Sequence, residues 1–211
     1  MSNLAYDNIC FLPDVFRASD YEVKPIHHWQ AKRFIERHHY SGGCSNTAVY
    51  CHGLYHRDGI NLLGVAMWLP PTRVAAESVN KDQWKRVLSL TRLAVHPLVP
   101  KNAASFLMSA SMRIIRREGR FCSLVTYADE ARGHKGQIYR AANWQYVGRT
   151  GPYPRWVDTD GRQVAQKATV NRVKAKMEEL GHKKVGSFHK HKFVVHLKPI
   201  QLRANRTQVL V

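Results

Sequence analysis

The segment that most constrains the fold runs from Ser89 to Gly119 and has the sequence SLTRLAVHPLVPKNAASFLMSASMRIIRREG. It begins with the pattern of a strand and ends with that of a helix, because Phe106, Ala110 and Ile114 fall on one helical face. A strand, a loop and a helix in this order can bind a phosphate group at the helix N-terminus. The loop HPLVPKNAAS nevertheless contains no glycine. The segment therefore either binds such a cofactor unusually or has exchanged it for another.

The remaining apolar runs predict a mixed sheet with helices on its faces, which is a three-layer α/β fold. We expect strands at residues 18–26, 46–56, 60–70, 86–95, 121–129, 144–150 and 191–200. We expect helices at 27–39, about 101–118, 135–143, and in a segment with Val170, Val173, Met177 and Leu180 on one face. The Asp58-Gly59 pair predicts a hairpin, and 151–161 is expected to be a turn-rich connection. The 211 residues are expected to form one domain with a basic C-terminal portion, about 162–211.

The chain is strongly basic, with 33 Lys and Arg against 15 Asp and Glu, a formal charge of +18. Twelve of the basic residues and only two of the acidic ones lie between Arg162 and Val211, which gives +10 there. Such a field attracts polyanions, although a solvated helix face and tail would explain the C-terminal excess more simply. No apolar run approaches the ~20 residues that span a bilayer, and the N-terminus lacks a secretory signal. We therefore expect a soluble intracellular protein that binds nucleic acid rather than membrane.

The cysteines raise the question of a metal site. CSNTAVYCHGLYH gathers Cys44, Cys51, His52 and His56, but the four cysteines of the chain form no CxxC pair. Residues alternate between the two faces of a strand, so Cys51 and His52 should point in opposite directions. We therefore predict neither a closed zinc site nor a disulfide framework.

Two groups of polar residues are candidates for catalysis. ERHHYSGG places His38, His39 and Tyr40 at a helix end before two glycines, where they can transfer protons or simply cap the helix. Asp129 ends a predicted buried strand, and Tyr139 lies on the helix that follows. Functional groups collect at strand C-terminal ends in such sheets, although a turn carboxylate and a core ring are the structural alternatives.

Three segments, LTRLAVHP, SLVTYAD and QIYRAANWQYVGRTG, resemble the core motifs of the GNAT acetyltransferase fold, over roughly Arg86 to Thr150. From end to end, the chain resembles the Mom family of phage proteins, most clearly in PIHHWQAKRFIERHHYSGG, CHGLYHRDGINLLGVAMWLPP and SLTRLAVHPLVPKNAASFLM. This resemblance implies a transferase that converts selected adenines in DNA to N6-carbamoylmethyladenine. It also implies a role in shielding phage DNA from host restriction enzymes, in the host cytoplasm.

The GNAT resemblance implies that the strand ending at Leu93–Val95 holds the donor and that a pyrophosphate would lie at the loop from Pro100 to Ser105. The cofactor-binding residues expected on this basis are Arg92, Leu93, Val95, Lys101, Asn102 and Ser105. A tyrosine at the position of Tyr139 commonly assists the leaving group. The expected catalytic set is His39, Tyr40, Asp129 and Tyr139.

The donor is less certain than the scaffold, because the GNAT loop carries glycines where this chain has PKNAAS. That departure argues against ordinary acetyl-coenzyme A. The implied product has a CH2 group joined to N6 and a terminal amide beyond it, so a glycine-derived donor, free or on an aminoacyl carrier, fits better than an acetyl group. Another acyl donor, and a redox metal such as iron held by histidines, stay open, although no metal ligands are assigned.

Double-stranded DNA is the expected partner, with the target adenine extruded from the helix because N6 chemistry is buried in the duplex. Tyr153 and Trp156 in GPYPRWVD are as well suited to stack on a base as to pack under a turn. The residues expected to contact DNA are His38, Tyr153, Arg155, Trp156, Lys174, Lys183, Lys184 and Lys190. Two other functions remain: an N-acetyltransferase acting on protein or tRNA, and a non-catalytic DNA-binding protein. The sequence leaves the oligomeric state open.

Overall fold

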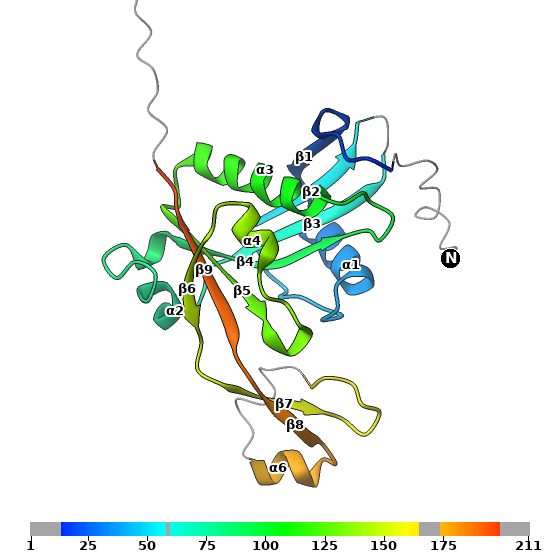
Figure 1. The fold of residues 1–211 in the computed structure, drawn as a ribbon, viewed down its shortest axis with the longest axis vertical. Helices are drawn as coiled ribbons and strands as arrows, with labels where there is room; N and C mark the ends of the chain where they lie inside the picture. Colours follow the sequence, from blue (N-terminus) through cyan, green and yellow to red (C-terminus); the bar gives the residue numbers. More distant parts are fainter. Residues whose placement is uncertain (1–13, 58–59, 165–173, 199–211) are drawn as a thin grey trace, which may run out of the picture.

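The computed structural model describes residues 14–57, 60–164 and 174–198. A seven-stranded sheet with the order β1-β2-β3-β4-β5-β9-β6 forms its centre (Figure 1). Its strands are β1 (Tyr21–Pro25), β2 (Tyr50–His56), β3 (Leu62–Leu69), β4 (Val87–Val95), β5 (Ser123–Asp129), β6 (Gln145–Arg149) and β9 (Lys190–His196). Only β4 and β5 pair in parallel among these strands; the other neighbouring pairs are antiparallel. The predicted mixed sheet is confirmed.

Two helices cover opposite faces of this sheet: α1 (His28–His38) and α3 (Ala103–Glu118). Because residues alternate along a strand, Met67 of β3 packs with the α1 side chains while its neighbour Trp68 packs with those of α3. The expected three-layer arrangement is therefore present. Shorter helical segments lie in the connections: η1 (Ala18–Asp20), α2 (Arg73–Glu77), η2 (Trp84–Arg86), η3 (Glu130–Arg132), α4 (Gln137–Ala141) and α6 (Lys174–Glu179). Within the described ranges, no helix is long and apolar enough to cross a bilayer.

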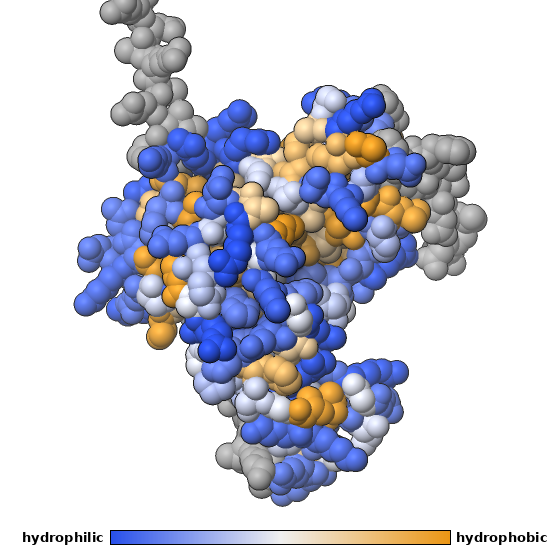
Figure 2. All heavy atoms as spheres, viewed as in Figure 1, coloured by the Kyte–Doolittle hydropathy of each residue, from blue (hydrophilic) through white to orange (hydrophobic). Residues whose placement is uncertain are grey.

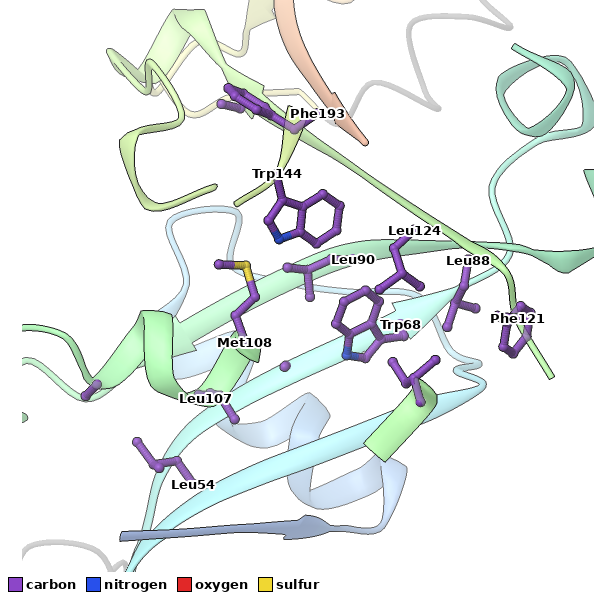
Figure 3. Close-up of a cluster of buried hydrophobic side chains, with 14 of the residues drawn as sticks. Leu54, Trp68, Leu88, Leu90, Leu107, Met108, Phe121, Leu124, Trp144 and Phe193 are labelled. Atoms are coloured by element: carbon purple, nitrogen blue, oxygen red, sulfur yellow. The ribbon is translucent and has the colours of Figure 1, made fainter. Parts of the chain in front are cut away.

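The larger core cluster lies beneath α3 and reaches across to α4 and β9 (Figure 3). The rings of Trp68 and Trp144 stack there with their centroids 6.5 Å apart. Phe193 of β9 fills the space beside Gly136, where an added Cβ would lie 2.3 Å from the ring, and Gly136 has a left-handed φ of +74°. Glycine is required at that position. The core thus fixes the loop before α4, which forms part of the candidate site.

A second, two-stranded sheet forms an arm beyond the start of β9 (Figures 1 and 2). It pairs β7 (Tyr153–Val157) with β8 (Lys183–Phe188) and lies next to α6. The prediction that 151–161 is only a turn-rich connection was wrong. Its prolines and glycines indicate turns, whereas the short strand β7 forms by pairing with β8, about thirty residues further along the chain. Helix α2 was also missed. The predicted Asp58-Gly59 turn, Val170 and Val173 lie outside the described residues.

Candidate active site

A cavity forms where β4 and β5 separate. Their parallel pairing ends at Leu90 and Thr126, although both strands continue for several residues. The space between their C-terminal ends is a cavity of about 180 Å³. Six of the residues predicted for catalysis or cofactor binding line it together: His39, Tyr40, Arg92, Leu93, Val95 and Tyr139.

A bulge in β4 marks the point of separation. Met67 of β3 pairs with Arg92 and Trp68 pairs with Leu90, so Thr91 is an extra residue on β4. The Thr91 hydroxyl donates a hydrogen bond of 3.2 Å to the carbonyl of Met67. A bulge bends a strand and re-aims its side chains, and here it directs β4 away from β5.

Arg92 ties β4 to the glycine loop after α1. Its Nε donates to the carbonyl of Gly43 at 2.8 Å, and its Nη1 donates to the carbonyl of Thr91 at 2.7 Å. These bonds hold the loop that carries His39 and Tyr40 against the cavity. The predicted contact of Arg92 with a phosphate therefore has to use its remaining donors.

His39 lies at the C-terminal end of α1 and reaches the cavity as a neutral ring. Its Nδ1 lies 2.8 Å from the hydroxyl of Ser41 and 3.1 Å from the Ser41 backbone N. Burial, and after it the electrostatic effect of Arg92, His134 and Arg132, lowers the pKa of His39 to about 4. At neutral pH the imidazole thus carries no charge and can donate or accept a hydrogen bond.

Tyr40 is held between its neighbours although its side chain is 49% exposed. The His39 ring lies 4.2 Å from the Tyr40 ring, and the His134 ring meets it edge-on at 5.4 Å. The guanidinium carbon of Arg132 lies 5.0 Å from its centroid. Burial and the charge of Asp129 raise the pKa of Tyr40, so the phenol is protonated at neutral pH.

Asp129 lies beside the cavity rather than in its wall. Its Oδ1 accepts a hydrogen bond of 3.0 Å from the backbone N–H of Ala131 and another from the hydroxyl of Tyr153. Burial and this bond raise the pKa of Tyr153. Asp129 therefore acts on Tyr40 through its charge and on the arm through Tyr153.

Tyr139 stands between two cavities. Its ring packs 5.2 Å from that of Phe193, and burial raises its pKa although a hydrogen bond with Thr126 opposes this. A second cavity of about 490 Å³ follows the loop at 133–139 and shares His134, Ile138 and Tyr139 with the first. Two adjoining cavities of this kind can hold two reactants whose reacting ends meet at the shared wall.

At the start of α3, an asparagine adopts the left-handed backbone conformation for which glycine is usually needed. Its N-cap residue, Asn102, adopts a left-handed φ of +79°, and the Ser105 hydroxyl donates to the Asn102 carbonyl at 2.8 Å. Lys101 is exposed, and Ala104 lines the first cavity. Small side chains and the first-turn N–H groups fit the approach of a phosphate-bearing donor, with Lys101 supplying charge.

The residues predicted to contact DNA differ in their accessibility. Lys183 and Lys184 are exposed on β8, whereas Arg155 is half-buried and its Nη1 donates to the carbonyl of Ala131 at 3.0 Å. Lys190 lies 4.9 Å from the Tyr153 ring, and burial lowers its pKa. The side chain of Lys174 lies outside the described residues.

Two of these predictions need revision. Trp156 is only 5% exposed, so its ring cannot stack on a DNA base, and that prediction was wrong. The residue packs under the arm, which was the structural alternative. His38 is half-buried, with its ring 4.5 Å from Phe34 and 4.9 Å from His96, an arrangement that suits packing at the helix end.

Three residues of the site were missed from the sequence: Tyr127, Arg132 and His134. Tyr127 and His134 line the first cavity, and Arg132 lies on the Tyr40 ring. Arg132 and His134 follow directly after Asp129, at the strand end where functional groups collect. That position was the one signal that could have found them.

The histidine and cysteine pattern in β2 has a structural role. Cys51 packs with the α1 cluster, whereas His52 faces α3 and its Nδ1 lies 2.5 Å from the Ser111 hydroxyl. The predicted opposite orientation of the two residues is confirmed. In the described part of the chain, no group of three or more His, Cys, Asp and Glu side chains is arranged to hold a metal ion.

Solved structures with this fold are GNAT acetyltransferases. The ribosomal-protein-S18-alanine N-acetyltransferase from Escherichia coli superposes with a TM-score of 0.51 and 9% identity, over 87% of this chain and 98% of that one. A protein from Desulfovibrio desulfuricans, described as an acetyltransferase of the GNAT family, gives 0.51 and 10% identity over 84% and 99%. Identities this low show the fold alone, and the predicted GNAT-like fold is confirmed.

Sequence comparison identifies the family. The methylcarbamoylase mom of Escherichia phage Mu is 29% identical over 140 residues, a match that covers 63% of this chain and 56% of that relative. The chain thus spans little more than half of that relative's length. The model of the Mom protein family matches residues 20–208, nearly the whole chain. The chain therefore belongs to the Mom protein family.

Proposed function

We propose that the protein is a transferase that modifies the N6 amine of selected adenines in double-stranded DNA, with N6-carbamoylmethyladenine as product. The observation that carries this proposal is the cavity at the β4–β5 separation, which gathers His39, Tyr40 and Tyr139 next to a basic arm. Membership of the Mom family and the formal charge of +18 support it.

The proposed transfer is a substitution at carbon. A bond forms between adenine N6 and the CH2 carbon of a carbamoylmethyl group, and the bond from that carbon to the donor's leaving group breaks. N6 loses one proton, and the leaving group departs with the electron pair and gains a proton. Because the N6 lone pair is delocalised into the ring, the reaction needs groups that move these protons while holding both reactants.

The cavity supplies groups for both proton transfers. Neutral His39 is suited to hold or accept the proton of N6, since its lowered pKa keeps it uncharged at neutral pH. Tyr40 and Tyr139, both protonated, are suited to donate toward the leaving group. Asp129 is proposed to position Tyr40 through its charge.

The donor is proposed to be derived from glycine, free or supplied by an aminoacyl carrier, with its carboxyl group already converted to the primary amide when the transfer occurs. The amino nitrogen on the CH2 carbon is then the leaving group, and it departs with the electron pair and gains a proton. The backbone of Leu93 and Val95, together with Lys101, Asn102 and Ser105 at the start of α3, would hold it, with Arg92 contributing its remaining donors. We further propose that the reaction takes place in the host cytoplasm and protects phage DNA from restriction.

The target adenine is proposed to leave the DNA helix and enter the cavity. The side chains in the cavity cannot reach N6 while the adenine is paired inside the duplex. A mismatch opposite the target adenine should increase binding and turnover, because less pairing energy is lost. No gain from the mismatch would contradict extrusion.

Two experiments separate the alternatives. DNA from cells that express the chain should become resistant to restriction enzymes, whereas DNA from cells that express Tyr40→Phe should stay sensitive. Calorimetry with acetyl-coenzyme A tests the N-acetyltransferase that the shared fold allows, and tight binding together with unmodified DNA would favour it. If the natural protein and Tyr40→Phe both bind DNA and neither alters it, the protein is a non-catalytic DNA-binding protein.

A further inference from the structure

Two arginines lie where the arm meets the end of β5. Arg132 belongs to η3, directly after Asp129, and Arg155 belongs to β7 of the arm. The Nη1 of Arg155 donates to the carbonyl of Ala131, the residue before Arg132, at 3.0 Å. Arg132 in turn lies 5.0 Å from the centroid of Tyr40, a wall of the first cavity. Arg132 thus contacts a residue of the cavity wall, and Arg155 contacts the residue next to Arg132 from an element that is distant in sequence.

The two guanidinium groups concentrate positive charge at this place. Neither arginine forms an ion pair with a carboxylate among the residues that the structure describes. Asp129, the nearby acid, already accepts hydrogen bonds from Ala131 and Tyr153. The positive charges of Arg92 and Lys190 also lie within electrostatic range of this region. An anion would therefore find a strongly favourable potential here.

The hydrogen bonding of the pair is also incomplete. In the described structure, the Nε atoms of Arg132 and Arg155 are both buried and lack an acceptor. Arg132 uses one Nη donor on Gln163 at 2.9 Å, and Arg155 uses one on Ala131. A buried charged donor without a partner costs free energy, so the pair is stabilised by an acceptor with several oxygen atoms.

We propose that Arg132 and Arg155 bind one phosphate of the DNA, the phosphate next to the modified adenine. This inference rests on the proposed function and adds a defined subsite to it. A nucleotide whose base enters the cavity leaves its own phosphates outside it, and Arg132 lies against Tyr40, a residue of the cavity wall that is 49% exposed. The bonds from Ala131 and Tyr153 to Asp129 fix the backbone and the arm that present the two guanidinium groups.

Binding of short single strands tests the proposal without the donor. The probe is a fluorescent heptanucleotide with one central adenine among thymines, made with ordinary linkages or with a neutral methylphosphonate on the 5′ or the 3′ side of the adenine. For the natural protein, one of these two replacements should weaken binding by about tenfold, the cost of a charged hydrogen bond. The same replacement should change binding by no more than about twofold in Arg132→Gln and in Arg155→Gln, because the partner is already absent.

Controls keep the outcome interpretable. Arg117→Gln removes an exposed arginine thirteen residues along α3 from Ala104, roughly 20 Å at the helical rise, and should keep the full methylphosphonate effect. Arg132→Lys should retain part of the effect, since it keeps the charge but not the forked donors. Thermal unfolding of each variant shows that it is folded.

The outcomes separate this inference from the proposed function. A tenfold effect that persists in both glutamine variants would overturn the phosphate site, as would equal binding of the three probes by the natural protein. A phosphate of the donor would then be the remaining ligand for the pair. Absence of binding to the ordinary heptanucleotide by a protein that binds duplex DNA would also overturn the phosphate site. Absence of binding to both would instead contradict DNA as the substrate, and this inference would fall with it.

Discussion

Two histidines in this protein share a strongly lowered pKa but occupy very different places. His52 lies beneath α3, 1% exposed, and His39 lies at the cavity where β4 and β5 separate. Burial lowers both pKa values to about 4. The neighbours differ: His52 meets the hydroxyl of Ser111, which also accepts from Trp68 at 2.6 Å, whereas His39 meets the charges of Arg92, His134 and Arg132.

The comparison shows that a shifted pKa alone does not identify a functional site. His52 is buried, pairs with the Ser111 hydroxyl and lines neither of the two cavities described above, so its neutral ring completes the core. His39 has the same protonation state next to space for a reactant and beside two further rings. The adjoining cavity and the nearby arginines, Arg92 and Arg132, distinguish the His39 site from the core. The lowered pKa does not, because His52 shares it.

The largest effect is expected at Tyr40. Tyr40→Phe should reduce adenine modification by about 10²–10⁴-fold, the usual contribution of a proton-transferring group. Nucleoside analysis of DNA from expressing cells measures it. The matched control is Tyr50→Phe, which removes a phenol that donates to Glu118 at the far end of α3, has a hydrogen bond with Arg120 and does not line the first cavity. Equal loss in both variants would mean that the phenol at the cavity has no special role.

Asp129→Asn and Tyr139→Phe should each reduce modification by about a hundredfold while DNA binding persists. The first removes the charge that acts on Tyr40, and the second removes a hydroxyl at the shared wall of the two cavities. Modification and DNA binding are measured on the same variants. Full activity in both would show that the site assignment is wrong.

The core histidine should appear in the pH dependence of stability. Its folded pKa of about 4 lies below the unfolded value near 6.5, so the unfolded state binds the extra proton between these values. Stability should be complete above pH 6.5, fall by up to roughly 3 kcal/mol toward pH 4, and level off below it.

Urea unfolding of the natural protein and of His52→Leu checks this dependence. The variant should be less stable at pH 7, because Ser111 loses a partner, and its stability should change less with pH. His39, whose pKa is also lowered to about 4, contributes to the same slope, so part of the pH dependence should remain in His52→Leu. An unchanged slope in His52→Leu would contradict the assignment of His52 to the core.

The smallest effect is expected on the exposed arm. Lys183→Gln and Lys184→Gln should each lower the salt dependence of duplex DNA binding by about 0.9 in the slope of log K against log salt. Lys24→Gln, on β1 at the other edge of the sheet, should leave the slope unchanged, since Lys24 pairs with Glu22. Equal slopes in all three variants would remove the arm from the DNA interface.

Much of the fold followed from local patterns. The segment Ser89–Gly119, whose loop contains no glycine, forms the predicted strand, loop and helix, and Asn102 supplies the left-handed residue that a glycine would usually provide. The arm did not follow, because β7 gains its order from pairing with β8 across a long stretch of chain. Short strands with proline are set by their partners, which a local pattern does not contain.

The site was predictable only where sequence neighbours act together. His39 and Tyr40 are adjacent in the chain, and both line the cavity. The meeting of Tyr40 with His134 and the bond between Asp129 and Tyr153 depend on tertiary packing. For the same reason, sequence could not show that Trp156 is buried or that Arg92 binds the carbonyl of Gly43.

The most direct test of the central claim is mass spectrometry of nucleosides from DNA of cells that express the protein, grown with isotope-labelled glycine or labelled acetate. The account predicts a deoxyadenosine that carries one additional carbamoylmethyl group, absent with Tyr40→Phe and labelled from glycine rather than acetate. Deoxyadenosine of unchanged mass in cells that contain folded protein would contradict it.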